Sequence, residues 1–212
     1  MNVNDKHMYH FHDPALYAEI WVPGNSFNID ENFESNIKNI TLNHDFLVQG
    51  NVSKFAVSKI LKHESKTNFE DIPISDIKHL LHDLKKIIVA GEMGIRELAL
   101  EEYRKDHYPH LPSRFSSLWV SNKKCLKYWN GIFNSEKDYR RDLYELLLNG
   151  TLFKTSDEFL PDDGLSYKDV YNSAEKYWNP NFKEIHDPYK IEYLFKGNVR
   201  ILKKYNDIKE IK

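Results

Sequence analysis

The chain has 212 residues, 41% of them hydrophobic, which is enough for one domain with a full core and excludes collagen-like and disordered chains. Its formal net charge is only -2, so the whole chain lacks the one-signed field of many nucleic-acid-binding and membrane-binding proteins. The single cysteine, Cys125, excludes an intramolecular disulfide. Every apolar stretch is far shorter than the roughly 20 residues that span a bilayer, so we expect a cytoplasmic protein with no membrane partner.

The N-terminal part predicts short extended segments joined by turns. Met8–Phe11 predicts an aromatic strand that ends at Asp13-Pro14, and Pro14–Ile20 predicts a brief helix. Trp21-Val22-Pro23-Gly24 predicts a turn. Polar and apolar residues then alternate in two segments that are either strands or extended loop, Ser26–Ile29 and Asn39–Leu42.

Residues 54–107 have apolar residues three and four apart, which predicts a helical insertion among the strands. Ser75 is expected to cap one of its helices and Gly91 to end it. A further helix, Ile95–Tyr103, is expected to be acidic on its outer face and apolar on its inner face.

The second half returns to alternating strands and helices. Phe115–Val120 predicts a strand and Asn122–Trp129 a helix. Tyr139–Leu148 predicts a strand whose hairpin partner is Leu152–Phe153, because Asn149-Gly150 is a strong turn signal.

The last third predicts a helix and a second hairpin. The helix runs from Ser166 or Tyr167 to Tyr177. The hairpin pairs Ile191–Phe195 with Val199–Leu202 around Lys196-Gly197-Asn198. Since the sequence has no internal repeat and no long linker, we expect one α+β domain over residues 1–212, with the helical insertion at 54–107.

Several common catalytic and metal-binding motifs are missing from the sequence. There is no GxxxxGK[ST] or GxGxxG phosphate loop and no GxSxG nucleophile elbow. His7, His10 and His12 are close in sequence, but clustering of this kind is not coordination geometry. With no HExxH, no CxxC and no carboxylate at a fixed offset, we expect no metal site.

The most unusual stretch is His110–Val120, which places Ser113, Arg114, Ser116 and Ser117 at the start of an apolar strand. Hydroxyls and a guanidinium together can hold a polyhydroxylated, anionic ligand such as a dinucleotide. The alternative is a serine turn that caps the strand, with Arg114 paired to a surface carboxylate.

Five short motifs, taken in order, give the chain a resemblance to bacterial ADP-ribosyltransferase-like domains. The resemblance extends over the whole chain, and the order of the motifs is more specific than any one of them. The motifs are Tyr9-His10, Trp21-Val22-Pro23-Gly24, Leu111-Pro112-Ser113-Arg114-Phe115-Ser116-Ser117-Leu118, Tyr177-Trp178 and Glu192-Tyr193-Leu194-Phe195-Lys196-Gly197.

This resemblance implies a split, strongly bent antiparallel β core that binds NAD as co-substrate in an open cleft. It implies that His10 binds a ribose hydroxyl, with His12 as the substitute if the strand register is shifted. Arg114 is implied at the pyrophosphate. The hydroxyls on the nicotinamide side are implied to come from Ser113, Ser116 and Ser117. An aromatic wall for the nicotinamide ring is implied to come from Tyr177 or Trp178, with Tyr103 or Tyr108 as the alternatives.

Glu192 is implied to be the catalytic acid, and its expected position suits that chemistry. Cleavage of the nicotinamide–ribose bond builds positive charge on the ribose, which a nearby carboxylate stabilises more than it stabilises the neutral sugar. In a strand, Ile191 and Tyr193 would face the other side and anchor Glu192. Taken without the other motifs, Glu192 is better explained as an ordinary solvent-facing strand residue.

The acceptor of ADP-ribose is the harder question. Transferases that modify arginine commonly carry an acidic residue two positions before the catalytic glutamate, whereas this chain has Lys190 there, which argues against arginine. We expect nucleic acid, RNA ahead of DNA, and the alternatives are a protein acceptor or an inactive nucleotide- or protein-binding module. The resemblance also implies a toxin of a toxin–antitoxin or phage-defence system, with an antitoxin protein as partner.

The charge distribution favours an anionic acceptor. Residues 1–106 carry 12 Lys and Arg against 17 Asp and Glu, whereas residues 107–212 carry 18 against 15. In the basic half, charged residues alternate with aromatic residues. This pattern suits single-stranded nucleic acid, whose bases stack on aromatic rings while Lys and Arg contact the phosphates. The simpler alternative is a solvent-exposed surface with half-buried aromatic rings. These residues are Lys123, Lys124, Lys127, Tyr128, Trp129, Lys137, Tyr139, Arg140, Arg141, Lys203, Lys204 and Tyr205.

Overall fold

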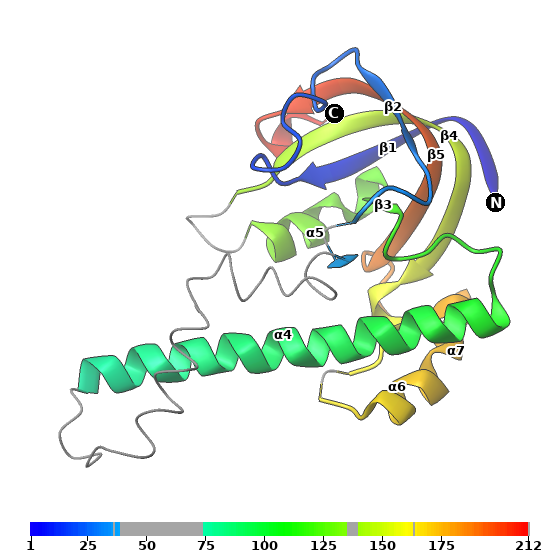
Figure 1. Ribbon diagram of the computed structural model, residues 1–212. Helices are drawn as coiled ribbons and strands as arrows, with labels where there is room; N and C mark the ends of the chain where they lie inside the picture. Colours follow the sequence, from blue (N-terminus) through cyan, green and yellow to red (C-terminus); the bar gives the residue numbers. More distant parts are fainter. Residues whose placement is uncertain (36, 39–73, 135–139, 163, 212) are drawn as a thin grey trace.

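The computed structural model describes residues 1–35, 37–38, 74–134, 140–162 and 164–211. Figure 1 shows a curved sheet above one long helix, with the shorter helices packed around them. The strands are β1 (Asn2–His12), β2 (Ser26–Ile29), β3 (Leu118–Val120), β4 (Asp142–Ser156) and β5 (Ile191–Tyr205). The α-helices are α4 (Ile74–His107), α5 (Leu126–Phe133), α6 (Tyr167–Ser173) and α7 (Glu175–Trp178).

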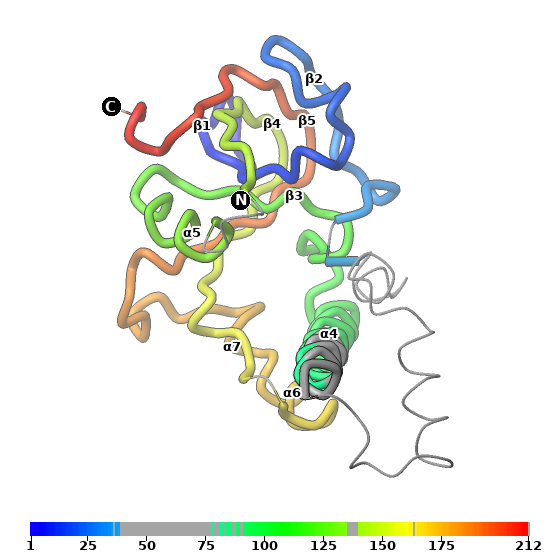
Figure 2. Tube along the Cα trace, turned by 90° about the vertical axis from the view of Figure 1, so that its left-hand side faces the viewer, coloured from blue at the N-terminus to red at the C-terminus, as the bar shows by residue number. Residues whose placement is uncertain are grey.

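All strand pairs are antiparallel, which confirms the predicted α+β class. Along the sheet the order is β1-β4-β5-β2, and β3 pairs with another stretch of β5. Tyr9 and Ser121 exchange backbone hydrogen bonds of 2.8 and 2.7 Å, so β1 also meets the chain just after β3. The sheet therefore curls on itself, and the first strand lies beside the middle one (Figures 1 and 2).

The two predicted hairpins do not form, because Asn149-Gly150 and Lys196-Gly197-Asn198 lie inside two continuous strands of 15 residues each. Gly150 pairs directly with Gly197. A Cβ on either glycine would lie 2.8 Å from the Cα of the other, and both have positive φ, 157° and 135°. Glycine is required here for the close approach of two bent strands, not for a turn.

The long helix α4 corrects two further expectations. It continues through Gly91 without ending. Its C-terminal half also buries acidic side chains instead of presenting them to solvent: Glu97 is 0% exposed and Glu101 5%, while Leu98 is 42% exposed. The expected helical block at 54–73 and the segment Asn39–Leu42 lie outside the described residues.

Three shorter elements also differ from expectation. Residues 14–20 form successive turns and no helix, because the Asp13 side chain and carbonyl accept from Ala15 and Leu16. β3 is limited to Leu118–Val120, since Ser113 holds the preceding residues in a turn. The helix expected at 166–177 is divided at Ala174 into α6 and α7.

Two hydrophobic clusters hold these elements together. The larger lies inside the curled sheet and includes Leu146, Leu148 and Ile201, all 0% exposed, with α5 packed against it. The smaller joins α4 to α6, α7 and the paired ends of β4 and β5, around Leu100, Leu194 and Trp178. The beginning of β5 lies between the two clusters.

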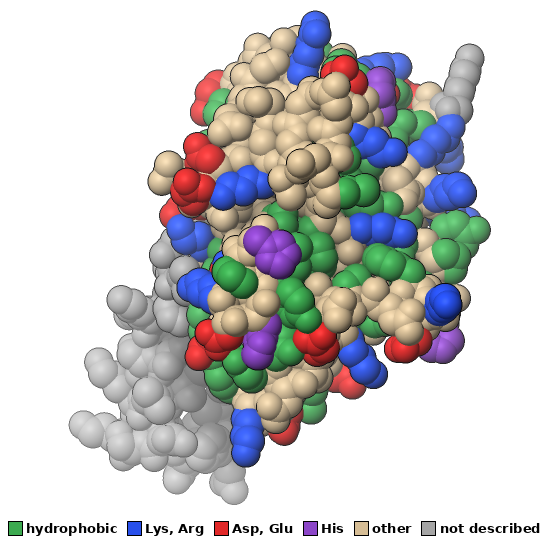
Figure 3. All heavy atoms as spheres, turned by 90° about the vertical axis from the view of Figure 1, so that its right-hand side faces the viewer, with side chains coloured by type: hydrophobic (Ala, Val, Ile, Leu, Met, Phe, Trp, Pro, Cys, Tyr) green, Lys and Arg blue, Asp and Glu red, His purple; other side chains and the backbone are tan. Residues whose placement is uncertain are grey.

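The surface shows no segregation of charge on the face in Figure 3, where positive and negative side chains are interspersed around apolar and histidine side chains. Among the described residues, no helix is long and apolar enough to cross a membrane.

Candidate functional site

A cavity of about 320 Å³ opens where β1, β3 and the start of β5 approach α4 and α5. β1 contributes His10, the loop after it Trp21, the segment before β3 Arg114 and Ser117, and β5 Glu192. The fold thus brings together residues that span most of the chain, including four of those that the sequence analysis singled out.

Glu192 belongs to a buried polar network behind the cavity. Arg114 donates to Glu192 Oε1 from Nη1 at 2.9 Å, and it forms a bidentate pair with Glu97 through Nε at 2.6 Å and Nη2 at 2.9 Å. Tyr177 accepts from Arg114 Nη1 and donates its hydroxyl to the same oxygen of Glu192. All four residues are at most 3% exposed. Together they link α4, the segment before β3, α7 and β5.

The second carboxylate oxygen of Glu192 makes no hydrogen bond within the described part of the chain. Glu192 Oε2 and Ser117 Oγ are both buried without a hydrogen-bond partner among the described residues, and both residues line the cavity. Burial raises the pKa of Glu192, while Arg114 and the Tyr177 hydroxyl act in the opposite direction. Since an unsatisfied buried polar atom costs about 1–3 kcal/mol, these two oxygens, together with Arg141 Nε, which lies beside the cavity and is also buried without a hydrogen bond to any described residue, point to a polar ligand.

Arg114 is held on all sides. Its guanidinium lies 4.2 Å from the Trp119 ring and 4.8 Å from the Tyr177 ring. Burial disfavours its charge, but Glu97, Tyr177 and Glu192 outweigh this and raise its pKa. Four of its five N–H groups are engaged by these protein partners, so its geometry suits orienting Glu192 better than binding a pyrophosphate.

His10 offers one ring nitrogen to the cavity. Nδ1 lies 2.7 Å from the carbonyl oxygen of Trp119, so Nδ1 carries the proton and Nε2 is an acceptor. The ring stacks on Trp21 at 4.7 Å, and burial lowers the pKa of His10 to about 3. His12 also stacks on Trp21, but its Nε2 is occupied by the carbonyl of Leu16 at 2.6 Å. The geometry therefore favours His10 over His12 as the ligand-binding histidine.

The other predicted site residues do not line the cavity. Ser113 accepts from the backbone N–H of Phe115 at 3.1 Å, as the capping alternative predicts, and Ser116 lies within the same turn. Trp178 donates to the Leu100 carbonyl and stacks on Phe153 in the smaller hydrophobic cluster.

The expected aromatic wall is built from different rings. Tyr177 reaches the site only through its hydroxyl, and Tyr103 and Tyr108 both donate to Glu175. Trp21 and Trp119 line the cavity instead. Trp21 belongs to one of the motifs that carry the resemblance, and Trp119 directly follows another.

Sequence reasoning missed Glu97, which fixes Arg114. The available signal was the spacing of Glu97, Leu100, Glu101 and Arg104, which places two carboxylates and an arginine on the same helical face as a core leucine. A buried polar face of this kind predicts ion pairs inside the protein.

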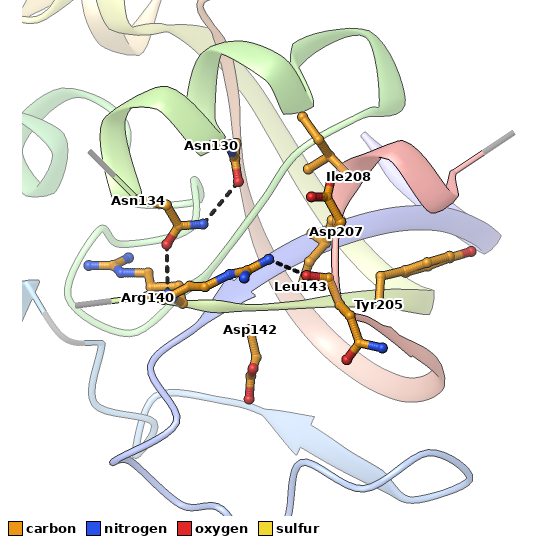
Figure 4. A pocket seen from close by; sticks show the side chains of 10 residues that line it. Asn130, Asn134, Arg140, Asp142, Leu143, Tyr205, Asp207 and Ile208 are labelled. Carbon is orange, nitrogen blue, oxygen red and sulfur yellow. Dashed lines mark hydrogen bonds between the residues drawn. The ribbon is translucent and has the colours of Figure 1, made fainter. Parts of the chain in front are cut away.

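A second pocket, of about 160 Å³, lies beside the end of β5 (Figure 4). Its polar groups largely satisfy one another: Asn134 donates to Asn130 at 2.9 Å and accepts from the Arg141 backbone at 2.7 Å, and Arg140 donates to the Asn206 carbonyl. It is therefore a weaker candidate than the larger cavity.

The rings expected to stack on bases are mostly engaged within the protein. Trp129 is 7% exposed and donates to the Ile191 carbonyl, and Tyr205 is 8% exposed and donates to Glu145. Tyr128 donates to Asp157. Lys123, Lys124 and Lys127 remain exposed on the segment that continues into α5, whose Trp129 lines the cavity. Lys137 and Tyr139 lie outside the described residues.

In the described part of the chain, no group of three or more His, Cys, Asp or Glu side chains is arranged to hold a metal ion.

Comparison with known proteins places the chain in a family without assigning a reaction. No curated protein matches the chain. One family model, described as "Protein of unknown function (DUF2441)", matches residues 8–207 and therefore most of the chain. The chain belongs to this DUF2441 family.

Proposed function

We propose that the chain is an NAD-dependent ADP-ribosyltransferase that acts in the cytoplasm and transfers ADP-ribose to nucleic acid, RNA ahead of DNA. The observation that carries the proposal is the convergence of His10, Ser117 and Glu192 on one cavity, with an unpartnered oxygen on both Ser117 and Glu192. The sequence resemblance implied these residue types at the first, middle and last strands of an NAD cleft.

Glu192 carries the chemical step in this proposal. When the bond between nicotinamide and ribose C1 breaks, its electrons leave with nicotinamide and positive charge develops on the ribose. Glu192 Oε2 is free to accept a hydrogen bond from the ribose 2-hydroxyl and to stabilise that charge. The acceptor then attacks C1, and its proton passes to the same carboxylate as general base.

Three other residues position the substrate and the carboxylate. His10 Nε2 accepts from a ribose hydroxyl, and the low pKa keeps that nitrogen unprotonated at neutral pH. Arg114 and Tyr177 engage Oε1 of Glu192, which leaves Oε2 as its reacting atom. Trp119 and Trp21 provide flat apolar surface for the nicotinamide ring.

A nucleic-acid acceptor is supported by the lysines near the cavity. Lys123, Lys124 and Lys127 are exposed, while Ser121 and Trp129 of the same segment line the cavity. Lysines in this position attract a phosphate backbone to the cavity mouth. The toxin role and the antitoxin partner belong to the proposal through the resemblance alone.

The test compares wild type with Glu192→Gln in the presence of labelled NAD and RNA, DNA or cell lysate. We expect nicotinamide release and label in RNA from wild type, and a loss of about 100-fold or more in the variant, since a group that stabilises transition-state charge is removed. Glu210→Gln is the matched control, because Glu210 is exposed, lies beyond the last motif and does not line the cavity.

Each outcome bears on a separate part of the proposal. Absence of nicotinamide release and of labelling in every mixture would contradict the enzyme and leave a binding module. Label that enters protein and survives nuclease would contradict only the nucleic-acid acceptor.

For the toxin role, expression should arrest bacterial growth, and Glu192→Ala or His10→Ala should relieve the arrest. Equal toxicity of the Glu192→Ala variant would contradict a catalytic cause.

A further inference from the structure

Helix α4 carries an exposed apolar stripe on the side that the cavity does not use. Leu81 is 60% exposed, Ile88 58%, Ile95 43% and Leu98 42%. These values are high for large aliphatic side chains on one helix, and contiguous exposed apolar surface marks interaction sites. Figure 1 shows α4 extending well beyond the sheet, and Figure 2 looks almost along the helix.

The stripe has the spacing of a coiled coil. Leu81, Ile88 and Ile95 are seven residues apart, and Leu84, Gly91 and Leu98 follow each of them by three. These are the a and d positions of successive heptads, which form the seam between two helices. Glu97 lies on the opposite side of α4, where it holds Arg114.

The stripe ends where α6 begins to cover the helix. Tyr167 and Tyr171 of α6 donate to Glu102 and Asp106, just beyond Leu98. The exposed window is therefore 81–98, which is about 27 Å at 1.5 Å per residue.

This window is complementary to itself in antiparallel orientation. When two copies are aligned so that Leu81 meets Leu98, every a position faces a d position of the other copy. The layers are Leu81 with Leu98, Leu84 with Ile95 and Ile88 with Gly91, each occurring twice by symmetry. Gly91 is exposed and a Cβ on it would meet nothing within 4 Å in its own chain, so there is open space for Ile88 of the second copy.

Charge favours the same alignment. The e positions flank the seam, and in antiparallel coiled coils e faces e of the partner. Lys85 then faces Glu92 of the second copy and Glu92 faces its Lys85, which gives two opposite-charge pairs. In a parallel alignment these two residues do not meet.

We propose that two copies of this chain associate through residues 81–98 of α4 as an antiparallel, two-fold symmetric coiled coil. The interface is isologous, since residue i contacts residue j and j contacts i. The α4 residues that line the cavity, Met93 and Arg96, are outside the a and d positions of the seam. This proposal is independent of the proposed function.

The first test is the mass of the full chain in solution, measured by sedimentation over a wide range of concentrations. We expect a dimer that Leu81→Glu and Ile88→Glu each weaken by about 100-fold or more, because symmetry places two charges in the seam. His82→Glu, next to the stripe but outside it, is the control. A monomer at every concentration, or a dimer insensitive to both variants, overturns the proposal; circular dichroism confirms that the variants are folded.

The second test addresses the register. Lys85→Glu and Glu92→Lys each create two like-charge pairs, so each should weaken the dimer by about 3- to 10-fold. An equimolar mixture of the two variants should form a heterodimer as tight as wild type, because both pairs are again opposite in charge. Lys78→Glu is the matched control, a charge reversal at an exposed lysine of α4 that lies outside residues 81–98. Failure of the mixture to restore association overturns the antiparallel register.

Discussion

Two buried arginines, Arg104 and Arg114, lie only ten positions apart but perform different tasks. Arg104 binds Glu101 of its own helix at 2.8 and 3.1 Å and donates to the carbonyls of Pro109 and Leu111. All its partners lie within seven residues. Arg114 instead binds Glu97, Tyr177 and Glu192, which lie 17, 63 and 78 positions away.

The two arginine networks differ in whether they leave a buried polar atom without a hydrogen bond, which separates a structural ion pair from a candidate functional one. Glu101 and Arg104 close the turn after α4, and both Glu101 oxygens are bonded. The Arg114 network leaves Glu192 Oε2 buried and unbonded beside a cavity. A fold that serves stability alone gains nothing from an unsatisfied carboxylate oxygen, so the second network is the one to test for chemistry.

The largest effect is expected from Arg114→Met. The substitution leaves Glu97 and Glu192 buried without their counter-ion, which typically costs about 3–5 kcal/mol of the free energy of unfolding. Urea denaturation at neutral pH measures it. A loss below that of Arg104→Met would contradict the central position given to Arg114.

Arg104→Met should lower the free energy of unfolding by less, about 1–3 kcal/mol, because Glu101 lies nearer the surface and only local turn contacts are lost. Nicotinamide release per folded molecule should remain at the wild-type value, measured beside Arg114→Met under the same conditions. If both variants lose turnover equally, the two networks are not functionally distinct.

Acid should destabilise the cavity through His10. Burial lowers its folded pKa from 6.5 to about 3, so the unfolded chain binds the proton first and the stability contribution present above pH 6.5 is lost as pH falls. Replacing His10 with Gln should therefore reduce the loss of unfolding free energy between pH 7 and pH 5 by about 1–2 kcal/mol. His186→Gln, at an exposed site, is the matched control.

The smallest effect has the opposite sign. Because the pKa of Glu192 is raised, its ionised form is disfavoured in the folded protein, and the stability linked to its protonation is lost as pH rises. Glu192→Gln cannot ionise, so its Tm should fall less than that of wild type as pH rises above 4.5, the ordinary pKa of the carboxyl. An equal or larger fall in the variant would show that the ionised carboxylate is a stabilising partner of Arg114.

The sequence was informative where a motif and its element coincide. His10 lies on the first strand and Glu192 is the second residue of the last, as expected, whereas Ser117, expected within the middle strand, lies directly before it. Burial of Arg114 was not foreseen, because its partner Glu97 is on a helix expected to be acidic outside. Whether a residue such as Arg114 is buried depends on contacts between segments that are far apart in the sequence, and the spacing of neighbouring residues does not show these contacts.

The false hairpins have the same origin. Asn149-Gly150 and Lys196-Gly197-Asn198 have the composition of tight turns, but each glycine is needed by the other strand. A turn signal reports only that backbone freedom is required at a position. Whether the chain reverses there, or two bent strands approach closely, depends on a partner far along the sequence.

The aromatic lining gives the cavity an optical consequence. Three of the four tryptophans of the chain, Trp21, Trp119 and Trp129, line it, and Trp21 stacks on two histidine rings. Three of the four tryptophan fluorophores therefore surround one site. A compound that enters the cavity comes close to these rings, so we expect its binding to change the emission of the unlabelled protein, whether or not the compound is coloured.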